Sequence, residues 1–191
     1  MKLNNVGKPE PSNGYKFVKN DDNSITASTG GLEYKGGSIF IHILRTSVQA
    51  NHYYFFSINI LSMVEKLGNN DDSILDFTHH VYRNNVESWP RVKKISSLND
   101  AGVHTGTFLT ISTKDSLYIE SYDWVEFTFK DTMVIDLTLM FGEGNEPSQN
   151  WCDKYLTNYY EYNEEGTLIP IKELGEPIKT SYYDKIDMFD Y

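Results

Sequence analysis

Cysteine is almost absent from this chain, because Cys152 is the only one among 191 residues. A single cysteine excludes an internal disulfide framework and any zinc site built from several cysteines. Free cysteines usually behave as small buried side chains, so we expect Cys152 to carry a buried thiol.

Long apolar runs and an excess of basic residues are also lacking. No stretch approaches the ~18 apolar residues of a membrane-spanning helix, and Met1 to Asn5 hold no apolar signal-peptide core. Lys and Arg number 17 against 27 Asp and Glu, a formal net charge of −10. This charge repels nucleic-acid backbones and anionic lipid surfaces. We therefore expect a soluble protein, made in a cytoplasm, that binds neither nucleic acid nor membrane.

Recognisable catalytic motifs are missing as well. The sequence contains no G-x-S-x-G, H-E-x-x-H, P-loop or dinucleotide-binding pattern. Its acidic residues cluster in loops and near the C-terminus, whereas a glycoside hydrolase needs two carboxylates on facing strands. His79 and His80 are adjacent, and neighbouring strand residues point to opposite faces, so the pair is poorly placed to bind one metal ion. We predict no enzymatic activity, no catalytic residues and no required cofactor.

Aromatic residues and short alternating runs are what the sequence does contain. Aromatics make up 14% of the chain, with fourteen tyrosines, and Tyr54, Phe56, Ile58 and Ile60 would form one apolar face of a strand. The expected strands cover residues 15–18, 24–28, 38–45, 53–61, 73–78, 107–113, 116–120, 124–129 and 133–137. Many short strands separated by turn residues predict an all-β antiparallel β-sandwich.

The two ends of the chain differ from this pattern. Residues 1–14 and 169–191 are rich in Pro, Gly and polar residues, which favours an N-terminal arm or linker and a C-terminal extension around a domain at 15–168. Arms of this composition cannot offset their ordering entropy by self-burial, so we expect them to pack on other subunits or stay mobile. The start at Met1 and the extended end favour a complete small structural protein.

The segment after the last expected strand predicts a turn and a short docking helix. Two glycines, Gly142 and Gly144, permit positive φ, and Ser148 is well placed as a helix N-cap. Trp151 with Tyr155, and Cys152 with Leu156, are spaced i to i+4 and can pack on a core. We expect Trp151 to anchor this helix.

These residues also resemble a known family. The resemblance lies in the strings DLT, MFG and GNEP within residues 136–147, a following Ser-x-x-Trp-Cys-Asp helix, and Tyr and Gly residues up to Leu168. Together they resemble the C-terminal signature of carbohydrate-binding-module-like, galactose-binding-like jelly-roll domains of bacteriophage tail and baseplate proteins. The match is closest over residues 133–168, and a weaker resemblance covers about 13–168.

The resemblance implies a jelly-roll sandwich with a short C-terminal helix and extended terminal arms. It also implies a virion structural protein of a tail, baseplate or fibre, multimeric in the particle, that contacts other virion proteins or host cell-wall glycan. The alternatives are an accessory carbohydrate-binding module of a glycan-degrading enzyme, a capsid decoration protein, or a free-standing hydrolase on a sandwich fold.

Sugar recognition requires aromatic faces for the apolar side of a pyranose and planar polar groups for its hydroxyls. The residues Tyr82, Arg83, Asn85 and Trp89 supply these types within ten positions, on an expected loop between strands. Trp89 precedes Pro90, which favours an extended conformation. A second candidate platform comprises Tyr118, Tyr122 and Trp124, and for either set the alternative is simple packing against neighbouring strands or another virion protein.

A structural calcium ion is the remaining candidate ligand. In jelly-roll modules of this kind, the resemblance implies an acidic calcium ligand near Asp131, just before the strand at Met133, with Asp21 or Asp22 contributed by the opposing N-terminal loop. The alternative is that each is a plain turn aspartate.

Overall fold

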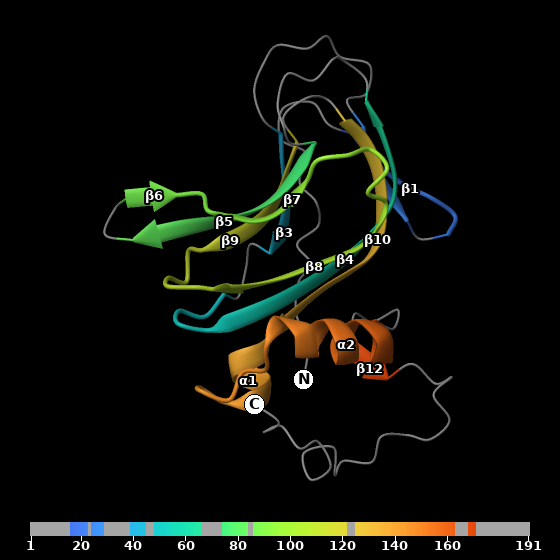
Figure 1. The fold of residues 1–191 in the computed structure, drawn as a ribbon. Helices are drawn as coiled ribbons and strands as arrows, with labels where there is room; N and C mark the ends of the chain where they lie inside the picture. Colours follow the sequence, from blue (N-terminus) through green and yellow to red (C-terminus); the bar gives the residue numbers. More distant parts are fainter. Residues whose placement is uncertain are drawn as a thin grey trace.

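The computed structural model describes residues 16–22, 24–28, 39–44, 48–65, 74–83, 86–121, 125–162 and 168–170. The strands are β1 (Lys16–Lys19), β2 (Ile25–Ser28), β3 (Ile39–Leu44), β4 (Tyr53–Glu65), β5 (Leu75–Arg83), β6 (Val86–Ser88), β7 (Arg91–Ile95), β8 (Gly102–Leu109), β9 (Ser116–Ser121), β10 (Val125–Asp136), β11 (Tyr160–Tyr162) and β12 (Leu168–Pro170). The helices are α1 (Leu137–Phe141) and α2 (Gln149–Tyr159) (Figure 1). The predicted arms at 1–14 and 169–191 lie outside the described residues, except for Ile169 and Pro170 in β12.

Two antiparallel sheets form the sandwich. The first has the strand order β1-β2-β10-β4-β8 and the second the order β3-β9-β5-β6, with β7 also pairing with β5. From β2 to β5, and again from β7 to β10, each successive strand lies in the other sheet. This repeated crossing gives an all-β antiparallel jelly-roll β-sandwich, so the predicted fold class is confirmed. No helix in the described part of the chain is long and apolar enough to span a membrane.

The main core lies between the two sheets. The expected apolar face of β4 is correct, because Tyr54, Phe56, Ile58 and Ile60 are all buried. Phe56 stacks on Phe77 of β5, with ring centroids 5.0 Å apart. Burying side chains of this size removes large apolar areas from water and supplies most of the driving force for joining the sheets.

A smaller core lies on the outer face of the first sheet, where both helices cover β4 and β10 (Figure 1). Phe55 points to this side of β4 and packs with Ile135 and Leu137. The buried helix residues are Cys152 and Leu156, at 0% and 1% exposure, so the buried thiol is confirmed, and burial raises its pKa to about 12. Trp151 is partly buried and packs against this core beside them, so its role as the anchor of the helix stays a prediction.

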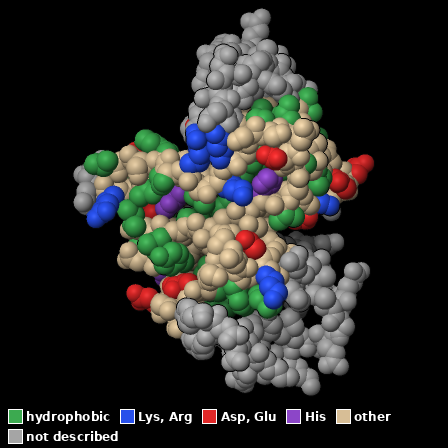
Figure 2. All heavy atoms as spheres, in the orientation of Figure 1, with side chains coloured by type: hydrophobic (Ala, Val, Ile, Leu, Met, Phe, Trp, Pro, Cys, Tyr) green, Lys and Arg blue, Asp and Glu red, His purple; other side chains and the backbone are tan. Residues whose placement is uncertain are grey.

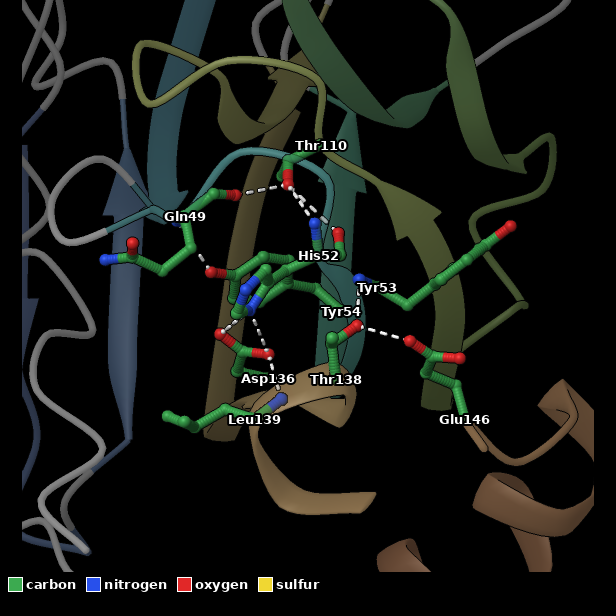
Figure 3. Close-up of polar contacts among 9 residues, drawn as sticks. All are labelled: Gln49, His52, Tyr53, Tyr54, Thr110, Asp136, Thr138, Leu139 and Glu146. Atoms are coloured by element: carbon green, nitrogen blue, oxygen red, sulfur yellow. Dashed lines mark hydrogen bonds and ion pairs between the residues drawn. The ribbon is translucent and has the colours of Figure 1, made fainter. Parts of the chain in front are cut away.

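A polar network joins β4, β10 and α1 (Figure 3). Asp136 ends β10 and caps α1, accepting a hydrogen bond of 2.8 Å from the Leu139 N–H. Both of its carboxylate oxygens also lie 2.9 Å from His52 Nδ1. An Asp side chain at a helix N-cap satisfies a backbone donor that the helix cannot. The expected strand at 133–137 therefore ends one residue early, and α1 was not predicted.

The rest of the network fixes the turn after α1. Thr138 Oγ1 accepts the Tyr53 N–H at 2.9 Å and donates to Glu146 Oε1 at 2.7 Å. Burial of Glu146 alone would raise its pKa, but the Thr138 hydroxyl and backbone N–H donors outweigh that effect and lower the pKa. Gly142 and Gly144 both adopt positive φ, as expected.

Gly106 allows β8 to approach the core. A Cβ atom at this position would lie 2.5 Å from Cε1 of the fully buried Phe56 and 3.0 Å from Cγ1 of Val92. We expect Gly106→Ala to lower the free energy of unfolding by about 1–3 kcal/mol, because inserted atoms force a packed core to shift. Urea melts measure this, with Val103→Ala on the exposed side of β8 as the control. Equal midpoints for the two variants would contradict the prediction.

Candidate functional site

The outer face of the second sheet carries an aromatic cluster centred on His80. Its members are His80 and Tyr82 on β5, Trp89 after β6, and Tyr118 on β9, and they are called the aromatic cluster below. The His80 and Trp89 rings are parallel within 3°, with centroids 5.2 Å apart. Tyr82 meets the His80 ring edge-on at 5.4 Å, and the Tyr118 ring lies 5.8 Å away.

Strand alternation places these side chains together. Phe77 and His79 point into the core, so His80 points out, and the prediction that His79 and His80 face opposite sides is confirmed. The loop expected to carry Tyr82, Arg83 and Trp89 was wrong for Tyr82 and Arg83, because β5 continues to Arg83 and β6 pairs back on it, with Tyr82 opposite Glu87. The β5–β6 hairpin projects at one end of the sandwich (Figure 1). Figure 2 shows hydrophobic side chains at this end, beside histidine and basic side chains.

Polar atoms connect the members of the cluster. His80 Nδ1 lies 3.1 Å from the Tyr118 hydroxyl, and His80 Nε2 lies 3.4 Å from Glu87 Oε2. A hydrogen bond from the Tyr82 hydroxyl lowers the pKa of Glu87 and, in return, raises the pKa of Tyr82. The Lys114 ammonium lies 5.3 Å from the centre of the Tyr82 ring. Phenol, imidazole, carboxylate and indole groups therefore meet on one surface.

A polar strip continues from the cluster along β5 and β9. Asp76 and Glu120 are direct neighbours across these strands, which corrects the expectation that no carboxylates face one another on strands. Each has a partner: Arg91 Nε lies 2.5 Å from Asp76 Oδ2, and the Thr78 hydroxyl donates to Glu120 Oε2 at 3.1 Å. The two carboxylates are nearly fully buried, and their partners offset the cost of that burial.

The structure places the predicted sugar-binding residues as follows. Tyr82 and Trp89 both contact the ring of His80. The sequence suggested His80 only as a possible metal ligand. Arg83 is exposed at the end of β5, and Asn85 lies outside the described residues. Tyr118, taken from the alternative platform, belongs to the same cluster, whereas Tyr122 and Trp124 lie outside the described residues.

A buried carboxylate supports the cluster from below. Asp115 is fully buried and accepts hydrogen bonds from the Tyr82 N–H at 2.9 Å and the Ile111 N–H at 2.8 Å. Its Oδ2 also lies 3.3 Å from Nε2 of His79, whose ring packs on Phe108. The backbone N–H of His79 donates to the carbonyl of Pro90 at 3.0 Å. These bonds fix both the connection from β8 to β9 and the segment that carries Trp89 to β5.

Burial is the main influence on His79, and it lowers the pKa of this side chain, although the nearby Asp115 carboxylate acts in the opposite direction. The folded protein therefore keeps His79 neutral at pH values where the unfolded chain, with a His pKa of about 6.5, already binds a proton. The free energy of unfolding should fall as pH decreases below about 6.5, by up to ~1.4 kcal/mol per pH unit.

Chemical denaturation between pH 5 and 8 measures this dependence. His79→Gln should flatten it, and His104→Gln, at a partly buried histidine on the other sheet, is the comparison variant. A slope that persists unchanged in His79→Gln would assign the effect to another group.

The two predicted calcium ligands are both exposed, Asp21 in a turn and Asp131 within β10. Asp21 is exposed beside Asp22, whose carboxylate accepts two hydrogen bonds from Ser24. Asp131 sits in an irregularity of β10 with φ 51° and an exposed side chain. In the described ranges, no group of three or more His, Cys, Asp or Glu residues could hold a metal ion. Calcium binding at Asp21 and Asp131 stays a prediction.

No protein-family model and no curated protein matches the sequence. Among solved structures, a mutant family 29 carbohydrate-binding module complexed with cellulohexaose is similar with a TM-score of 0.40 and 9% identity, over 67% of this chain and 80% of that chain. The CBM22-1 xylan-binding domain of Paenibacillus barcinonensis Xyn10C gives 0.37 and 11%, over 63% and 84%. The C-terminal domain of the sugar-binding protein EclA gives 0.32 and 11%, over 55% and 81%. Similarity this low transfers neither a ligand nor a site to this chain.

Proposed function

We propose that this protein is a non-catalytic carbohydrate-binding β-sandwich that holds sugar at the aromatic cluster. The parallel stack of Trp89 on His80 carries the proposal. His80 covers one face of the indole, yet 53% of Trp89 remains exposed. An indole ring that is exposed on one face and held by a second ring on the other offers a flat apolar surface on which a sugar ring can stack.

The chemistry of the surrounding groups suits a pyranose. The apolar face of the sugar would stack on Trp89, and its hydroxyls would bond to the Glu87 carboxylate and the exposed Arg83 guanidinium. The surface is open, so a single site should bind weakly, and many copies on one particle would provide avidity. The nearby carboxylates Asp76 and Glu120 already interact with Arg91 and Thr78. These contacts favour a structural role for the two carboxylates over a catalytic one.

The biological setting we propose is a bacteriophage virion, on a tail, baseplate or fibre, where the sandwich attaches to host-surface glycan or to neighbouring virion proteins. This finer role is supported by the resemblance of residues 133–168 to phage tail and baseplate domains. An accessory module of a glycan-degrading enzyme, or a capsid decoration protein, would use the same sandwich. Mass spectrometry of purified particles tests the setting, since the chain should be present at many copies per particle.

Trp89→Ala is expected to reduce binding of a multimerised protein to bacterial cell walls by at least tenfold. Loss of one aromatic stacking partner at the centre of a small site removes much of its affinity. Pull-down with insoluble walls measures the bound fraction, and thermal melting confirms the fold. The matched control is Tyr53→Ala, which removes a 43% exposed aromatic side chain on the other sheet.

Two results would count against this function. Equal wall binding by folded Trp89→Ala and wild type would move the site elsewhere. Release of reducing sugar from walls by the wild type, abolished in Glu120→Gln, would instead identify a hydrolase that uses the opposed carboxylates.

A further inference from the structure

His80 is the one residue that contacts every other member of the aromatic cluster. Its ring stacks on Trp89, meets the edge of Tyr82, and has one nitrogen beside Tyr118 and the other beside Glu87. The side chain is 14% exposed, while Glu87 is 38% exposed. Trp89 has no other ring contact among the described residues. Its orientation therefore depends on His80.

The charged and titratable groups around His80 come from several elements. Glu87 on β6 faces Nε2, Tyr118 on β9 faces Nδ1, and Tyr82 lies on the same strand. Lys114, in the connection from β8 to β9, lies over Tyr82 and not over His80. His79 and Asp115 lie on the core side of β5. Further along the same face, Asp76 is paired with Arg91, and Glu120 accepts a hydrogen bond from Thr78.

We infer that His80 is a protonation-dependent positioning residue, which holds Trp89 more firmly as the pH falls and so strengthens sugar binding at the cluster. The inference rests on the proposed function. Protonated imidazole is a cation parallel to the indole face, a favourable arrangement. The same proton gives Nε2 an ion pair with Glu87, whose carboxylate stays charged because the hydrogen bond from Tyr82 lowers its pKa.

A neutral His80 keeps the stack but loses both charge-dependent interactions. Nδ1 can still accept the Tyr118 hydroxyl proton while Nε2–H faces Glu87, so the cluster persists at higher pH. Only the fraction of molecules with Trp89 held in place changes, and the apparent affinity follows that fraction. The expected gain in affinity between pH 8 and pH 5.5 is about two- to fivefold, the size of a partly exposed cation–π interaction.

Tryptophan fluorescence of the ligand-free protein tests the coupling without any sugar. Histidine titrates between pH 5 and 8, and a protonated imidazole against an indole should quench its emission. The wild type should show a pH-dependent component that is lost in Trp89→Phe and in His80→Phe and kept in His104→Gln. Its presence in His80→Phe would overturn the inference and leave the proposed function untouched.

Wall binding across the same pH range tests the consequence for sugar. The probe is bacterial cell wall stripped of phosphate polymers, so that the probe does not titrate between pH 5.5 and 8. Wild type should bind two- to fivefold more tightly at pH 5.5. His80→Phe, which keeps an aromatic stack without a charge, should bind with the same affinity at both pH values.

The remaining outcomes separate the two proposals. Wall binding that requires Trp89 but does not depend on pH in the wild type would overturn this inference and leave the proposed function in place. A fluorescence titration that depends on His80, together with no wall binding at any pH, would overturn the proposed function and with it the regulatory role. Pronounced loss of binding in His80→Ala, rescued by His80→Phe at pH 8, would support the positioning role.

Discussion

Replacing Asp115 by alanine is expected to lower the free energy of unfolding by about 2–5 kcal/mol, since each buried donor left without a partner costs about 1–3 kcal/mol. The substitution leaves the backbone N–H groups of Tyr82 and Ile111 without an acceptor, because both donate to this fully buried carboxylate. The loop between β8 and β9 would separate from the end of β5. Urea denaturation at pH 7.5, where His79 is neutral, measures the loss.

The control for Asp115→Ala is Ser112→Ala in the same loop. The Ser112 hydroxyl accepts only the exposed Lys114 N–H, at 3.1 Å, so this variant should change stability by less than about 0.5 kcal/mol. Asp115→Asn keeps one acceptor oxygen and should fall between the two. Wild-type stability for Asp115→Ala would show that water replaces the carboxylate.

Leu156→Ala is expected to destabilise the protein by about 2–5 kcal/mol, the usual cost of a large-to-small change in a packed core. Leu156 is 1% exposed and lies with Phe55 and Ile135 in the small core beneath the helices. The truncation leaves a cavity between α2 and the first sheet, and the surrounding side chains can fill it only in part. Urea melts of the intact chain give the change in midpoint.

Trp151→Ala is the matched comparison on the same helix. Trp151 is larger than Leu156 but only partly buried, packing on Phe141 and Tyr155 at 5.5 Å and 5.0 Å. We expect it to cost about 1–2 kcal/mol, less than Leu156→Ala, because only part of its area leaves water on folding. A larger loss for Trp151→Ala than for Leu156→Ala would identify Trp151 as the anchor of α2.

Periodicity made much of the sandwich predictable. The alternation through Tyr54, Phe56 and Ile58 gives β4 its buried face, and the opposed directions of His79 and His80 follow from the same rule. The i to i+4 pair of Cys152 and Leu156 identified the face of α2 that docks. Each of these patterns lies within one short segment, so it can be read from a single sequence.

The rest depends on contacts between distant segments. The size of Trp151 can be read from the sequence, whereas its partial burial against the small core cannot. The segment around Tyr82 and Trp89 lacks a clear alternation and so predicts a loop, although backbone pairing of β5 with β6 forms a hairpin there. His80 meets Tyr118 across 38 residues, and Asp76 meets Glu120 only through the register of β5 and β9. No spacing rule in the sequence reports such pairs.

The position of β10 has a consequence for how the protein is made. This strand lies between β2 and β4 in the first sheet, with Phe127 opposite both Ala27 and Met63. While the ribosome is still translating residues before 125, β2 and β4 have no strand to join them, and their edges stay open to other chains. Sheets closed by such distant segments fold slowly, on a scale of about milliseconds to seconds. We therefore expect nascent chains truncated before β10 to aggregate or to recruit chaperones, and complete chains to fold only after Asp136 has emerged.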